Sequence, residues 1–142
     1  MDHAVYVDFK EKELDKLADG SKTMIIRGAA GRKLPHGRVN AGDILYFVNN
    51  NGEGVIKASA IVKSVYNSEK MTEEESKKLV NENIEKLQLS KKQFDKWAGK
   101  RYVTLVEVDN VKSIAPFEID KSRYGNMDDW LLVEDIENAR MK

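Results

Sequence analysis

Alternating apolar and polar positions predict several strands in the first half of the chain. Between Ala4 and Phe9, the residues Val5, Val7 and Phe9 fall on one face, as in a half-buried strand. In the next predicted strand Ile25 and Ile26 are adjacent, which indicates that both of its faces are covered. A turn at 49–54, rich in asparagine and glycine, predicts a hairpin. The further strands predicted from this pattern are Thr23–Arg27, Ile44–Val48 and Val55–Val65.

Helical spacing of apolar residues predicts two kinds of helix. A short helix is expected from about Glu11 to Ala18, with Asp8 near its start and Gly20 after its end. Two capping boxes, Thr72–Glu75 and Ser90–Gln93, then open a helical insert at about 72–97. Its expected inward positions are Leu79, Val80, Ile84, Leu87, Phe94 and Trp97.

The C-terminal third returns to strand pattern. Tyr102–Val108 is a predicted strand that Val111–Ile114 continues, and residues 116–127 read as irregular. The apolar segment 130–136 fits a helix or a strand equally well. Together these elements predict one α+β domain over residues 1–142. It is expected to be a small, mixed and mainly antiparallel β-barrel, closed or nearly closed, with peripheral helices.

Composition restricts the class of protein. The chain has 142 residues, 41% of them apolar, and 24 basic side chains balance 24 acidic ones, so an anion-binding site has to be local. There is no cysteine, which excludes disulfides and thiolate metal sites. No apolar run approaches the roughly 20 residues of a membrane span. We therefore expect a soluble, cytoplasmic and monomeric protein that does not associate with membranes.

Positive charge gathers around one glycine-rich loop. No acidic residue occurs between Asp19 and Asp43, whereas five basic residues do: Lys22, Arg27, Arg32, Lys33 and Arg38. A basic loop of this kind is typical of anion binding. The motif Gly28-x-x-Gly31 also matches the backbone clamp of KH domains, but here it follows a strand. His3 and His36 lack metal-ligand spacing, so neither a metal nor a cofactor is predicted.

The octet Gly20–Arg27 resembles the signature of ASCH domains, G-x-K-x-x-E-x-R, on the second strand of a PUA-like barrel. The segment Gly42–Phe47 resembles the "GD-apolar" strand of PUA-like folds, and the helical insert before Tyr102 also fits. The chain is similar to an archaeal branch of that superfamily. The resemblance implies a β-barrel with a cleft beside the Lys22–Arg27 strand, and an RNA, a modified base or another nucleotide-like molecule as ligand.

By position, Lys22 and Arg27 match the basic residues of the signature, but Ile25 stands where the signature has its acid. Isoleucine cannot transfer a proton, which argues against hydrolysis and leaves anion binding intact. Lys22 and Arg27 are also an odd number of residues apart, so a regular strand would point them to opposite faces.

The leading hypothesis is an RNA-binding module. Arg27, Arg32, Lys33 and Arg38 would contact phosphates and Lys22 the base or ribose, so that Lys22 would affect ligand choice more than folding. Tyr124 or Trp130 would offer a stacking face, with core packing as the other role for Trp130.

The alternative is a small amidohydrolase acting on a modified nucleoside. It would use Lys22 with an acid such as Glu107 or Glu53, although a structural ion pair is the other role for Glu107. A third possibility is a protein-interaction role for the helices between Thr72 and Lys96.

Overall fold

The computed structural model describes residues 1–123 and 129–141. Six strands form one sheet in the order β2-β5-β4-β3-β1-β6. The parallel pair is β1–β3, and the other neighbouring strands are antiparallel. The strands are β1 (Asp2–Val7), β2 (Met24–Ala29), β3 (Ile44–Asn49), β4 (Val55–Asn67), β5 (Tyr102–Glu118) and β6 (Trp130–Glu134).

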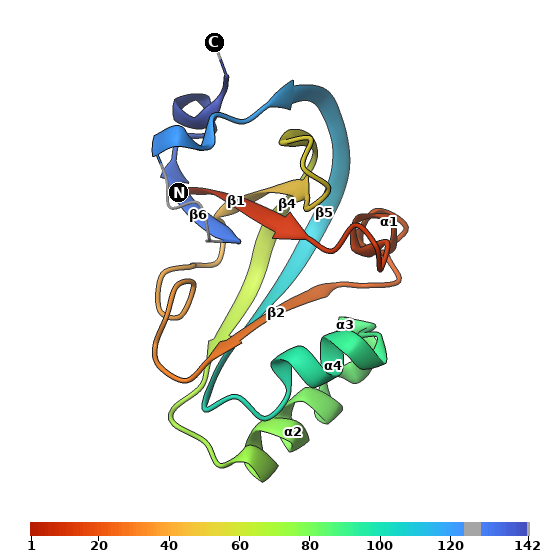
Figure 1. Ribbon diagram of the computed structural model, residues 1–142, viewed down its shortest axis with the longest axis vertical. Coiled ribbons are helices and arrows are strands. Elements are labelled where there is room, and N and C mark those ends of the chain that lie inside the picture. Colours follow the sequence, from red (N-terminus) through yellow and green to blue (C-terminus); the bar gives the residue numbers. More distant parts are fainter. Residues whose placement is uncertain (124–128, 142) are drawn as a thin grey trace.

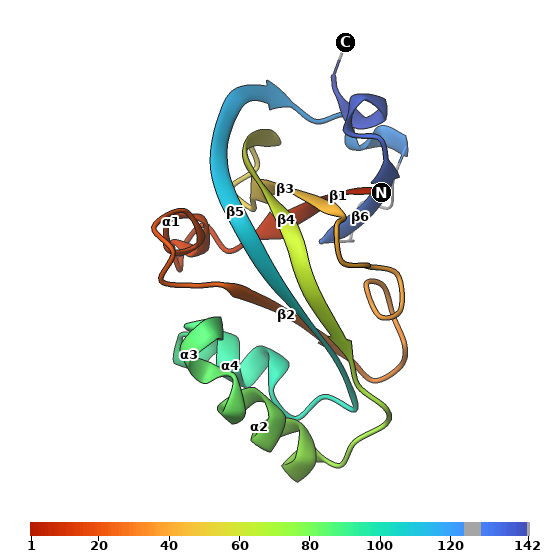
Figure 2. The ribbon, with the colours of Figure 1, turned by 180° about the vertical axis from the view of Figure 1, so that it is seen from behind.

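The sheet curls into a half-barrel. The long strands β4 and β5 run beside each other along the molecule, and the edge strands β2 and β6 leave one side open (Figures 1 and 2). The prediction of a mixed, mainly antiparallel and barrel-like sheet with peripheral helices is therefore confirmed, in a curled and incomplete form. Within the described residues, no strand pairing joins β2 to β6.

The helices are short and lie outside the sheet. They are α1 (Glu13–Ala18), α2 (Glu73–Glu82), α3 (Ile84–Leu87) and α4 (Lys91–Trp97), followed by the 3₁₀ turns η1 (Lys121–Arg123) and η2 (Ile136–Ala139). The helices α2, α3 and α4 gather at one end of the molecule, next to β2 (Figures 1 and 2). Both predicted capping boxes form, at Thr72 and at Ser90. No helix in the described parts of the chain is long and apolar enough to cross a membrane.

Several predicted boundaries need correction. The N-cap of α1 is Lys12 rather than a residue near Asp8, although Asp8 accepts a hydrogen bond from the backbone N–H of Glu11. β5 continues past Val108 to Glu118 as one strand, which includes part of the segment predicted to be irregular. The ambiguous segment 130–136 forms β6 and the start of η2.

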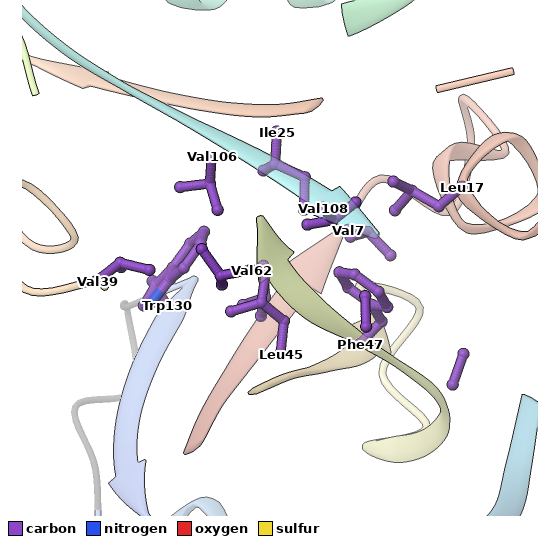
Figure 3. Close-up of a cluster of buried hydrophobic side chains, with 13 residues drawn as sticks. Val7, Leu17, Ile25, Val39, Leu45, Phe47, Val62, Val106, Val108 and Trp130 are labelled. Atoms are coloured by element: carbon purple, nitrogen blue, oxygen red, sulfur yellow. The ribbon is translucent and has the colours of Figure 1, made fainter. Parts of the chain in front are cut away.

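Strand β2 separates two apolar clusters, as the adjacent isoleucines predicted. Ile25 is fully buried inside the curl of the sheet, among the side chains shown in Figure 3. Met24 and Ile26 point the other way and pack against α2–α4 together with Val80 and Leu87. Arg27 has the parity of Ile25, so this strand carries its arginine to the inner side of the sheet, where the half-barrel is open.

Candidate functional site

Arg27 spans the open side of the half-barrel. Its Nη2 donates to the carbonyl of Tyr6 on β1 at 2.6 Å, and its Nη1 donates to the carbonyl of Ile26 at 2.8 Å. Its Nε lies 3.2 Å from a carboxylate oxygen of Asp129, just before β6. The guanidinium carbon is 5.4 Å from the ring centre of Trp97 and 5.6 Å from that of Trp130. A side chain from β2 thus reaches β1 and the start of β6 across a gap that has no backbone pairing.

The Nε–H of Arg27 is buried and has no hydrogen-bond partner among the described residues. Asp129 is close enough for an ion pair, but its direction from the N–H is unfavourable for a hydrogen bond. A buried unsatisfied donor costs free energy. Arg27 therefore retains the capacity to donate one more hydrogen bond at this position.

A cleft with two lobes surrounds Arg27. Lobe A, of about 260 Å³, lies against the basic loop, and lobe B, of about 270 Å³, lies against β1 and α1. Four of the described residues line both lobes: Arg27, Lys96, Trp97 and Asp129. Lobe A is also lined by Lys33, His36, Tyr102 and Thr104, and lobe B by Tyr6, Asp8, Glu13, Asn50 and Gln93. Aromatic walls with a few charged groups are typical of small-molecule sites.

The basic loop is held in place by the end of β4. His36 Nε2 donates to the carbonyl of Ser68 at 2.8 Å, and the backbone N–H of Gly37 donates to Asn67 Oδ1 at 2.8 Å. The His36 ring meets the ring of Tyr102 edge to face, with centres 5.7 Å apart. These contacts fix the loop beside lobe A although it contains no regular structure.

The predicted phosphate ligands occupy different places on this loop. Lys33 lines lobe A. Arg32 lies outside it, 61% exposed, with its guanidinium carbon 5.5 Å from the Tyr102 ring centre and an ion pair of 3.1 Å to Glu69. Arg38 is exposed on the far part of the loop. The structure therefore brings Arg27 and Lys33 together in one cleft and places Arg32 and Arg38 on the adjoining surface.

Lys22 does not reach the mouth of this cleft. It is 1% exposed, and its ammonium donates to the Leu87 carbonyl at the end of α3 and lies 3.3 Å from Glu13 Oε2. Burial lowers the pKa of Lys22 from its ordinary value, and the Glu13 carboxylate opposes that shift. Lys22 borders lobe B only through Glu13. The position expected for Lys22, beside the base or ribose of a ligand, needs correction, because its charged end is buried in an ion pair with Glu13.

Three of the remaining candidates, Trp130, Glu107 and Glu53, line neither lobe of the cleft. Trp130 is 1% exposed and belongs to the core (Figure 3), where its Nε1 donates to His3 Nδ1 at 3.1 Å. Glu107 forms a 2.7 Å ion pair with Lys86 and accepts a hydrogen bond from Ser64. Glu53 pairs with Lys57 at 3.8 Å. Tyr124 lies outside the described residues. In the described part of the chain, no three histidine, aspartate or glutamate side chains gather in a way that could hold a metal ion.

Several residues of the cleft did not emerge from the sequence as site residues, among them Glu13, Lys96, Trp97 and Tyr102. Trp97 was predicted to face inward from its helix, and it does pack beside the core cluster under α2–α4. Glu13 looked like an ordinary helix acid, yet it is 6% exposed. In the sequence, a cation next to an aromatic residue, Lys96 and Trp97, at the end of a predicted helix was the available indication of a binding site. These two residues line the cleft because α4 packs against β2.

The curled, incomplete sheet with a few short helices outside it defines the class of fold, which the comparison with solved structures identifies as ASCH-like. Three solved structures share it, all of an ASCH protein from Zymomonas mobilis. One matches with a TM-score of 0.66 and 14% identity, over 96% of this chain and 92% of that one. Two point variants of that protein match with TM-scores of 0.63, at 13% and 11% identity, over 82% of this chain and 75% and 73% of theirs.

No protein-family model matches the sequence, and no curated protein sequence matches it. At such low identities the structural matches establish the fold alone. They bear out the resemblance to the ASCH type, but they give no support to the narrower expectation of an archaeal branch.

Proposed function

We propose that the protein binds single-stranded RNA or a related nucleotide, with the phosphates on the basic loop and one base inserted into the cleft beside Trp97. The observation that carries the proposal is the convergence on one cleft of the cations Arg27, Lys33 and Lys96 with the rings of Trp97 and Tyr102. RNA recognition commonly takes an unstacked base against an aromatic ring while cations hold the backbone.

Charge along the loop supports this orientation of the ligand. Lys33 lines lobe A, and the exposed Arg32 and Arg38 extend the positive surface away from it. On a chain with no net charge, this is a local attraction for phosphates rather than a general affinity for polyanions. The Lys96 ammonium lies 4.7 Å from the ring centre of Trp97. A phosphate bound by Lys96 and a base stacked on Trp97 would therefore be close enough to belong to one nucleotide.

The test is the binding of a fluorescently labelled nine-nucleotide oligouridine at several salt concentrations. With three to four phosphate contacts, log K should fall against log salt with a slope of roughly −2 to −3, at about −0.7 per contact on single strands. A variant with Lys33→Ala and Lys96→Ala should bind more weakly and should have a slope closer to zero by about one unit or more.

The matched control removes two exposed lysines from β4 and β5 that line neither lobe, Lys63→Ala with Lys112→Ala. It lowers the net charge equally but should leave the slope almost unchanged. An affinity that does not vary between low and physiological salt, or an equal effect of both double variants, would contradict the proposal.

A second function, hydrolysis of an amide on a modified nucleoside, is favoured by one observation. The acid that such a reaction requires beside Lys22 is present, because the Glu13 carboxylate lies 3.3 Å from the Lys22 ammonium and lines lobe B. Conversion of an N-acylated nucleoside to the deacylated nucleoside and the free carboxylate by the wild type, and its loss in Glu13→Gln, would favour this function over binding alone.

A further inference from the structure

We infer that lobe B is a base-recognition subsite, in which the Glu13 carboxylate and the Gln93 side-chain amide hydrogen-bond the edge of a guanine. The inference rests on the proposed function, and it adds which base the cleft selects. It is carried by two polar side chains at one cavity, from elements 80 residues apart in sequence, that are both only 6% exposed.

Glu13 is held rigidly. Its Oε1 accepts a hydrogen bond from the backbone N–H of Asp8 at 2.8 Å, and its Oε2 faces the Lys22 ammonium at 3.3 Å. Lys22 is in turn fixed by the Leu87 carbonyl. A carboxylate has about four acceptor positions, so each oxygen keeps one for a ligand. A buried acceptor whose direction is set by two donors is suited to recognition, because little side-chain entropy is lost on binding.

Gln93 is oriented by the capping box of α4. Its Oε1 accepts from the backbone N–H of Ser90 at 3.1 Å, while the Ser90 hydroxyl accepts from the backbone N–H of Gln93. The group that Gln93 offers to a ligand is therefore its Nε2 amide, a hydrogen-bond donor. Lobe B thus contributes a strong acceptor from α1 and a neutral donor from α4.

The two lobes differ in charge. Lys33 lines lobe A and not lobe B, whereas two acids and one cation, Asp8, Glu13 and Lys121, line lobe B and not lobe A, so lobe A is the more positive of the two. A ligand with a phosphate at one end and N–H donors at the other fits this difference with the phosphate at lobe A. Trp97, which lines both lobes, offers its ring to the base between them.

Among the four standard bases, guanine complements lobe B. Its ring N1–H and its amino group are adjacent donors that a carboxylate accepts together, and its O6 is an acceptor for the Gln93 amide. Adenine and cytosine place a ring-nitrogen lone pair beside their amino group, which would face the negative carboxylate. Uracil has a single N–H between two carbonyl oxygens. Contacts of this kind to base edges are how proteins obtain sequence specificity in single strands.

The experiment compares nine-nucleotide RNAs that are uridine except at the central position, which is G, inosine, A, C or U. The oligomer with central G should bind about tenfold more tightly than that with central inosine, which lacks only the amino group. It should also bind more tightly than those with A, C or U, on the scale of one hydrogen bond to a charged group.

Two variants assign this preference to lobe B. Glu13→Leu with Lys22→Met removes both members of the buried ion pair, so no charge is left unpaired, and such replacements are often neutral for stability. It should abolish the difference between G and inosine, whereas the slope of log K against log salt with oligouridine should stay as steep as in the wild type, because that slope reports the phosphate contacts. Gln93→Leu should reduce the preference for G in the same assay. Asp15→Asn, on the exposed side of the same helix, is the matched control and should retain it.

The outcomes separate this inference from the proposed function. Salt-dependent binding of oligouridine without any preference for G, or a preference for G that survives in the Glu13→Leu, Lys22→Met variant, would overturn the guanine subsite and leave the RNA-binding function standing. Failure of every oligomer to bind would overturn the RNA-binding function itself, and the guanine subsite with it.

Discussion

At the scale of single residues, burial decides what the charged and polar side chains do. Ile25 stands where the ASCH signature has an acid, and it is fully buried in the core, a place where an unpaired carboxylate would be costly. Lys22, which the signature suggested as a ligand contact, is instead the partner of Glu13. The acid that this lysine needs thus comes from α1, nine residues earlier, and not from its own strand.

The buried hydrogen-bonded series Trp130–His3–Asp43 is a second example of polar groups whose role is set by burial. Indole Nε1–H is only a donor, so His3 Nδ1 has to accept, and the ring proton lies on Nε2, which donates to Asp43 at 2.8 Å. This arrangement requires a neutral imidazole. Burial lowers the pKa of His3, and it outweighs the hydrogen bond and charge of Asp43 that raise it.

We predict that the protein loses stability as the pH falls below about 6.5, the ordinary pKa of histidine. In that range His3 is protonated in the unfolded chain and stays neutral in the folded protein, because its pKa is lower there. The free energy of unfolding therefore declines by at most about 1.4 kcal/mol for each pH unit. Urea unfolding at pH 7.5 and 5.5 measures the loss.

The variant His3→Gln should remove most of this decline, whereas His36→Gln, which alters a partly exposed loop histidine, should keep it. A wild type that is equally stable at both pH values would show that His3 is not the titrating group.

At the scale of elements, local signals located the helices and strands, and tertiary contacts set their limits. The capping boxes start α2 and α4 where predicted, because each satisfies the free N–H groups of the helix with its own side chains. Asn110 has a φ of 53°, which is a local irregularity in the strand. β5 nevertheless continues through this residue, because β4 pairs with β5 on both sides of it. The segment 130–134 is a strand because β1 offers it a pairing edge.

The approach of β2 to the end of α4 depends on Gly28. A Cβ at this position would lie 3.0 Å from Lys100 Cγ, 3.1 Å from Lys100 Cβ and 3.3 Å from the carbonyl oxygen of Trp97. We predict that Gly28→Ala lowers the free energy of unfolding by about 1–3 kcal/mol, the usual cost of overpacking. It should also weaken RNA binding, because it displaces Trp97 and Lys96. Urea unfolding and the oligouridine assay measure the two effects.

Gly31→Ala is the matched control, since a Cβ there would meet no atom within 4 Å. Indistinguishable behaviour of the two variants would mean that the contact between β2 and α4 adjusts without cost.

At the scale of the whole molecule, a side chain, and not a strand pair, bridges the open side of the half-barrel. The Arg27 guanidinium donates to carbonyl groups on β1 and β2 and lies beside Asp129, while the rings of Trp97 and Trp130 are within 6 Å of it. The same group lines both lobes of the cleft. Closure of the sheet and construction of the site are therefore coupled.

We predict that Arg27→Lys lowers the free energy of unfolding by at least about 2 kcal/mol, because one ammonium cannot replace the forked donors that reach two carbonyls and an acid. Amide hydrogen exchange should become faster at β1, β2 and β6, where the gap would open. Arg38→Lys, on the exposed part of the loop, should change neither measurement. Unchanged exchange at those strands in Arg27→Lys would show that the sheet holds its curl without this bridge.

The sequence by itself determined the elements, the fold class and the place of the positive charge. Hydrophobic periodicity, turn residues and capping boxes act over a few neighbouring residues, so they can be recognised in the chain directly. They predicted the strands up to Val65, the helices after Thr72 and the basic loop, and the resemblance of Gly20–Arg27 to the ASCH signature predicted the type of barrel.

Only the tertiary structure decided which distant side chains and backbone groups contact one another. It brought Tyr6 to Arg27, Glu13 to Lys22 and Trp97 to the open side of the sheet, and it turned Lys22 and Trp130 inward. These pairs are separated in sequence by up to 70 residues, and their distances depend on how helices and sheet pack. Local pattern cannot encode that packing, because the free energy that selects it comes from apolar burial summed over the whole molecule.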